Sequence, residues 1–65
     1  MNKDQWEGRW NELRGKVKEH LGRLTDDDLQ EAEGKRDSLL AKIQSRYGDS
    51  KDAAEKRLEE LERKL

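Results

Sequence analysis

The residues of this 65-residue chain whose types could do chemistry are three consecutive carboxylates and one imidazole. Asp26, Asp27 and Asp28 could bind a cation. A calcium loop, however, needs oxygen ligands at alternating positions, a turn glycine and a closing Glu, and that spacing is absent. His20 has no second His and no Cys near it in the sequence. We therefore predict no catalytic residue, no metal ligand and no cofactor.

The hydroxyl side chains also lack the neighbours that nucleophilic catalysis needs. Ser38, Ser45 and Ser50 stand outside any nucleophile-elbow motif, and the chain has no glycine pattern of the kind that binds phosphate. A core this small also leaves little volume for a substrate pocket of roughly 300 Å³ or more. The sequence thus predicts a protein that is not an enzyme.

The composition favours a folded but strongly hydrated protein. Charged residues make up 48% of the chain, yet fifteen basic and sixteen acidic residues leave a net charge of −1 at pH 7. Such charge density can accompany disorder, whereas balanced charge with strong hydrophobic periodicity favours a helical fold. Only 29% of the residues are hydrophobic. We therefore expect a marginally stable monomer, or weak self-association into a homo-oligomer.

No feature of the sequence predicts contact with a membrane. Its apolar runs fall well short of the roughly 20 residues that span a bilayer, and the N-terminal residues 1–6 contain no apolar signal region. The chain has no cysteine, which excludes disulfides and thiolate metal sites. We expect a cytoplasmic protein.

A single apolar stripe defines the first predicted helix, which runs from about Asp4 to Leu21. The stripe recurs at spacings of four, three, four and seven residues and spans about 60° of a helical wheel. It consists of Trp6, Trp10, Leu13, Val17 and Leu24. Gly22 is predicted to end this helix at a position that favours a positive φ. Tryptophans one turn apart are usually core residues, although exposed ones would mark a binding surface.

A short second helix is predicted over residues 26–33. Thr25 and Asp28 have the spacing of a capping box, and the three aspartates face the positive end of the helix dipole. Dipole compensation is therefore the alternative to a cation site for these carboxylates. Gly34 should break or bend the chain after this helix.

Two more helices complete the predicted fold. Residues 35–47 should form a third helix that Gly48 ends, and Asp49 or Ser50 should cap a fourth helix that continues to about Arg63. We predict an all-α fold of four short helices, of which the first is relatively long and the second relatively short. These helices should form two packed αα-hairpins in a single domain, residues 1–65.

The two halves of the chain match when one is shifted by 26 residues. This shift places Leu13 on Leu39, Val17 on Ile43, Leu21 on Tyr47 and Gly22 on Gly48. The match predicts a structural repeat, or it reflects the common punctuation of helices by glycine and cap residues. Both interpretations stay open.

Three glycines within the first predicted helix and directly after it stand at intervals of seven residues. Gly22 has a role as the stop, but Gly8 and Gly15 lie almost opposite the tryptophan stripe and each costs the helix about 1 kcal/mol relative to Ala. Two interpretations remain. The cost is tolerated and softens the helix, or these glycines form a smooth face where a partner or a second copy makes contact.

The basic residues do not predict a nucleic-acid interface. Such an interface needs a continuous basic face, but in the first helix the cations lie on both flanks of the stripe with glutamates between them. The third helix carries a similar set. We interpret all of these side chains as solvated flanks: Arg9, Arg14, Lys16, Lys18, Lys35, Arg36, Lys42 and Arg46.

Several short strings of the sequence, taken in order, resemble the CsbD-like family. These are Gly15-Lys16-Val17-Lys18-Glu19, Gly22-Arg23-Leu24-Thr25-Asp26-Asp27-Asp28, Glu33-Gly34-Lys35-Arg36-Asp37, Lys42-Ile43-Gln44, Tyr47-Gly48 and Lys51-Asp52-Ala53-Ala54-Glu55. The resemblance implies a small bacterial cytoplasmic protein with a four-helix fold, abundant under general stress or in stationary phase. It implies no established activity and no catalytic residues.

The sequence and the resemblance together favour a non-enzymatic, hydrophilic stress-response protein. Its charged surface would shield other macromolecules, or it would associate weakly with itself. The alternative is a helical binding module that docks on one partner, either a protein or, with less support, a nucleic acid, through the first helix at Gly8 and Gly15. The partner itself is unknown.

Overall fold

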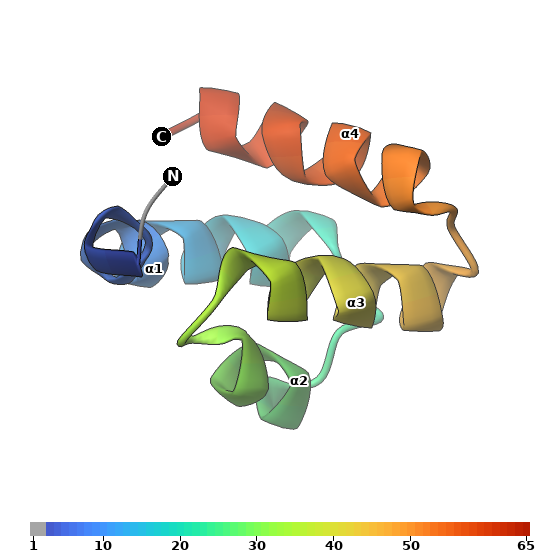
Figure 1. Cartoon of the computed structure of the whole chain (residues 1–65), viewed down its shortest axis with the longest axis horizontal. Helices are drawn as coiled ribbons and strands as arrows, with labels where there is room; N and C mark the ends of the chain where they lie inside the picture. The colour runs from blue at the N-terminus through green and yellow to red at the C-terminus, as the bar shows by residue number, and fades with distance from the viewer. Residues whose placement is uncertain (1–2) are drawn as a thin grey trace.

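The computed structural model describes residues 3–65, and four α-helices account for most of this range (Figure 1). They are α1 (Lys3–His20), α2 (Asp26–Ala32), α3 (Arg36–Tyr47) and α4 (Lys51–Arg63). Within the described range there is no strand. The all-α prediction is confirmed, and the predicted ends of the helices differ from the observed ones by one residue or so.

Short side chains start two of the helices as predicted. At α2, the Asp28 backbone N–H donates to Thr25 Oγ1 (3.1 Å), and the Thr25 N–H donates to Asp28 Oδ2 (3.0 Å). At α4, Ser50 Oγ accepts from the Ala53 N–H (3.2 Å). Each cap satisfies backbone donors that have no partner within the helix.

The two predicted glycine stops behave differently. Gly48 ends α3 in the left-handed region, with φ 68°. The prediction for Gly22 is wrong, because no positive φ occurs at this residue. Instead the Leu21 N–H still donates to Val17 O (2.7 Å), and the Leu24 N–H donates to Leu21 O (3.1 Å). This tight turn buries both leucines, and Gly22 lies inside it without needing the left-handed conformation.

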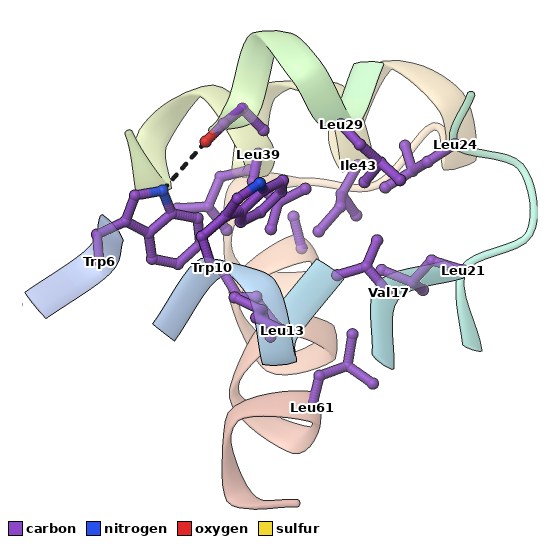
Figure 2. Close-up of a cluster of buried hydrophobic side chains, with 14 residues drawn as sticks. Trp6, Trp10, Leu13, Val17, Leu21, Leu24, Leu29, Leu39, Ile43 and Leu61 are labelled. Carbon is purple, nitrogen blue, oxygen red and sulfur yellow. Dashed lines mark hydrogen bonds between the residues drawn. The ribbon is translucent and has the colours of Figure 1, made fainter. Parts of the chain in front are cut away.

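One hydrophobic core forms between the helices (Figure 2). Both tryptophans belong to it, which confirms the core interpretation of the stripe, and their ring centroids are 5.5 Å apart. Tyr47 packs against the core from its edge, whereas Ala41 and Leu65 are exposed. The buried apolar residues are Trp6, Trp10, Leu13, Val17, Leu21, Leu24, Leu29, Ala32, Leu39, Leu40, Ile43, Ala54, Leu58 and Leu61.

The helices pack as a chain of neighbours: α2 on α3, α3 on α4, and α4 on α1. In Figure 1, α3 lies between α2 and α4, and α4 runs back along α3, so these two form an antiparallel hairpin. Since α2 packs against α3, the details of the predicted pair of hairpins are not confirmed. All four helices contribute to the core, and they leave α1 and α2 bordering a common stretch of surface.

Candidate functional site

Gly8 and Gly15 lie on the exposed face of α1. A Cβ atom added to either residue would meet no other atom within 4 Å, apart from the two residues adjacent in sequence and the nearby backbone of the same helix. Packing inside the protein therefore does not require glycine at these positions. Their contact with a partner stays a prediction.

The three aspartates at the start of α2 point to different surroundings. Asp26 is exposed and pairs with Lys18 of α1 (Nζ–Oδ1 2.9 Å), whose hydrogen bond lowers the pKa of the Asp26 carboxyl. Asp27 is exposed, and Asp28 is buried. Among the described residues, no group of three or more His, Cys, Asp or Glu side chains could hold a metal ion. His20 is exposed at the last residue of α1.

Asp28 is the centre of a buried ionic network that sequence reasoning missed. Its carboxylate is 2% exposed and accepts from Arg46 Nε (2.8 Å) and Nη2 (3.1 Å) of α3, while Lys42 Nζ lies 3.7 Å away. The hydrogen bond from Arg46, followed by that from the Thr25 N–H, lowers the pKa of Asp28 to about 2 against the opposing effect of burial. Asp28 thus takes part in the capping box and also joins α2 to α3.

The cations of this network were predicted to be solvated flanks of the third helix; Arg46 is indeed exposed, but Lys42 is half-buried, and both pair with carboxylates of α2. Lys42 and Arg46 are one turn apart beside the buried Ile43, so both point to the start of α2. Lys42 also forms an ion pair with Glu31, and its bond to this carboxylate raises the pKa of Lys42. The signal that could have revealed the network was this shared face next to a core residue.

Further ion pairs and cation–π contacts lie near the ends of the helices. Arg36 at the start of α3 binds Glu62 near the end of α4 (Nη2–Oε1 3.1 Å). The guanidinium groups of Arg23 and Arg57 lie over the ring of Tyr47, at 5.3 Å and 4.6 Å from its centroid. Arg57 is also paired with Asp49. These contacts hold neighbouring segments of the fold together, and none of them suggests a reaction.

A polar groove runs along the surface between α1 and α2. It consists of two adjoining depressions of about 280 Å³ and 490 Å³ that share Trp10, Asn11, Gln30 and Glu33. Arg14 and Asp26 line the smaller depression, and Glu7 and Gly34 line the larger one. We call these eight residues the α1–α2 groove.

The groove is an open depression on the surface, so it does not contradict the expectation that the small core encloses little volume for a substrate pocket. The volume lies on the outside, where two helices meet, and a core built from few side chains does not limit it. Neither His20 nor any serine lines the groove, so it offers no hydroxyl nucleophile with an imidazole base. Its chemistry is that of hydrogen bonding and charge pairing.

Over residues 3–65, no helix combines the length and the apolar character that a membrane-spanning segment requires.

The chain is similar over nearly its whole length to several known proteins. Three relatives are the UPF0337 protein YjbJ of Escherichia coli O6:H1, UPF0337 protein ECA0631 of Pectobacterium atrosepticum and UPF0337 protein pc0632 of Protochlamydia amoebophila. They are 55%, 56% and 52% identical to the chain over 98%, 95% and 98% of its length. The matches cover 93%, 90% and 97% of these relatives. None of the three names is that of an enzyme.

No solved structure matches the chain. The sequence pattern of the family described as CsbD-like matches residues 4–56, which is most of the chain and includes α1, α2 and α3 almost entirely. This match and the identity to the relatives show that the chain belongs to the CsbD-like family.

Proposed function

We propose that this protein is a non-enzymatic stress-response protein that shields other macromolecules with a highly charged, hydrated surface. The observation that carries the proposal is the separation of its side chains. The large hydrophobic residues gather in one core, and Leu65 is the exposed exception among the described residues. A folded molecule with 48% charged residues then presents mainly ionic groups to its surroundings.

The physical basis of the shielding is charge of both signs at high density. Fifteen basic and sixteen acidic side chains bind water strongly, while the net charge of −1 prevents strong attraction to any one partner at long range. Such a molecule can separate partly unfolded proteins without binding them tightly. Neither the names of the relatives nor the lining of the α1–α2 groove suggests catalysis.

Protection of a client enzyme tests this proposal. An enzyme that loses activity on heating or drying is treated alone, with this protein, and with an equal mass of a folded protein of similar size and ordinary charge content. We expect clearly more residual activity with this protein than with the control. Equal residual activity in the two mixtures would contradict the shielding function.

Weak self-association through α1 is the second candidate function. The open space around Gly8 and Gly15 favours it. Glycine at these positions lowers the stability of the helix, and no packing contact within the monomer requires it. Sedimentation equilibrium should then show a mass that rises with concentration, and Gly15→Leu should abolish the rise by blocking close approach. Gly15→Ala, with its small side chain, serves as the matched variant and should weaken it less. A constant monomer mass would contradict this candidate.

A further inference from the structure

The α1–α2 groove is built from one face of each of its two helices. Its α1 residues follow a spacing of three, one and three, and Asp26 and Gln30 of α2 stand four apart, so each set lies on one side of its helix; Glu33 and Gly34 follow directly after α2. The lining is rich in polar groups that can act as both donors and acceptors. These are Asn11 and Gln30, which are both exposed and face the groove from opposite helices.

Trp10 supplies a hydrogen-bond donor at the base of this groove. The side chain is only 4% exposed, yet its indole N–H has no acceptor within the part of the chain that the structure describes. Trp6, by contrast, donates from Nε1 to Ala32 O at 3.1 Å, and in Figure 2 the dashed line is drawn at this indole alone. Buried side-chain nitrogens in the described range all have partners, so Trp10 Nε1 must reach solvent, and the residue lines both depressions.

The charges along the groove are unequal at its two ends. Glu7 lines the larger depression and Glu33 lines both, and each of these exposed carboxylates forms no ion pair with a base in the described range. At the smaller depression, Arg14 lies near Asp26, and its charge adds to that of Lys18 in lowering the pKa of the Asp26 carboxyl. The groove therefore carries two unpaired negative charges, Glu7 at the larger depression and Glu33 where the two depressions adjoin, while Arg14 and Asp26 offset each other at the smaller one.

We propose that the α1–α2 groove binds a short basic segment of another polypeptide. The Trp10 N–H would donate to a backbone carbonyl of the segment, and the amides of Asn11 and Gln30 would pair with neighbouring peptide groups, which have the same donor and acceptor atoms. Glu7 and Glu33 would accept from a Lys or Arg side chain. A nucleic acid does not fit, because the unpaired carboxylates would repel its phosphates.

The affinity is weak, since the groove is open and water competes for every contact; a dissociation constant on the order of 1 mM is expected. This binding does not depend on the proposed shielding function. It acts through a single surface, whereas the shielding function requires only the overall charge of the molecule.

The two indole N–H groups give a direct test by ¹⁵N NMR spectroscopy of the intact protein. The probe is the capped peptide acetyl-Ala-Lys-Ala-Arg-Ala-amide, and the control peptide carries Glu in place of Lys and Arg. We expect the Trp10 indole signal to shift and saturate with the basic peptide, while the Trp6 signal, whose donor is already bonded, shifts little. The acidic peptide should move neither. No shift at Trp10, or equal shifts with both peptides, would overturn the proposal.

A pair of variants separates the groove from general electrostatic attraction. The variant with Glu7→Gln and Glu33→Gln should weaken binding of the basic peptide about fivefold, as expected for the loss of two partly solvated ion pairs. The matched variant has Asp52→Asn and Glu59→Gln on the exposed face of α4 and the same net charge. It should bind as the unchanged protein does. Equal weakening in both variants, or a saturable Trp10 shift with a single-stranded oligonucleotide instead of the peptide, would contradict a peptide-binding groove.

Discussion

Asp28 shows how one side chain can cap a helix and join two helices at once. Burial of a carboxylate is unfavourable by itself, but here the Thr25 N–H and the Arg46 guanidinium donate to it, and the pKa of Asp28 falls to about 2 as a result. Arg46 stays about half exposed, so its charge remains partly hydrated. The pair therefore avoids much of the cost of burying two charges.

Replacing this carboxylate should destabilise the fold more than replacing its neighbour. Asp28→Asn keeps an oxygen for the cap but loses the charge that Arg46 and Lys42 face. We expect the free energy of unfolding in urea to fall by about 2 kcal/mol, in line with the pKa shift. Asp27→Asn, at an exposed position of the same turn, should change it little. Similar losses in the two variants would show that the buried pair is not the cause.

The low pKa of Asp28 predicts that the protein loses stability in acid. The pKa of Asp28 is about 2 in the folded protein and 3.8 in the unfolded reference, so the unfolded state takes up the proton first. Its stabilisation is present above about pH 4 and is lost as the pH falls toward 2. Urea unfolding measured from pH 6 to pH 2 should show this loss, and Asp28→Asn should flatten it. An equally steep loss in the variant would assign it to other carboxyls.

Local sequence determines the ends of some helices, and tertiary packing determines the ends of others. The Thr25–Asp28 capping box and the Gly48 stop were predicted correctly, and Ser50 is one of the two residues predicted to cap α4, because each of these signals acts within four residues. At Gly22, packing of Leu21 and Leu24 in the core decides the turn instead. The 26-residue match accordingly extends to buried core positions but not to the two glycine stops.

Within α1, the glycines should be replaceable with a gain in stability. Gly8→Ala and Gly15→Ala each add a methyl group into open space and should raise the free energy of unfolding by about 1 kcal/mol. Gly48→Ala should lower it, since a Cβ is strained at φ 68°. Thermal unfolding monitored by circular dichroism measures all three. A loss of stability in Gly15→Ala would mean that α1 needs glycine there for the monomer fold.

For the whole molecule, periodicity predicted the helices and the core residues but not the contacts between helices. The Asp28–Arg46 and Arg36–Glu62 pairs join residues 18 and 26 positions apart, and no local spacing encodes them. Glu31 of α2 likewise pairs with Lys42 of α3. The partners of these side chains follow from how the helices pack.

The α1–α2 groove escaped prediction for a related reason. Its residues are polar and exposed, so on each helix they follow the pattern of an ordinary solvated face. Only the placement of α2 beside α1 turns two such faces into one concave surface with Trp10 at its base. The sequence did predict correctly that both tryptophans are buried.

The charged exterior of the folded molecule is the property on which the proposed function depends, and it can be changed without changing the net charge. A variant with Lys51→Gln, Asp52→Asn, Lys56→Gln and Glu59→Gln removes two bases and two acids from exposed positions of α4. Circular dichroism verifies that its helices are intact. The decisive measurement is the residual activity of a client enzyme after drying, with equal masses of the unchanged protein or the variant. We expect the variant to protect clearly less, and equal protection by the two would contradict shielding by surface charge.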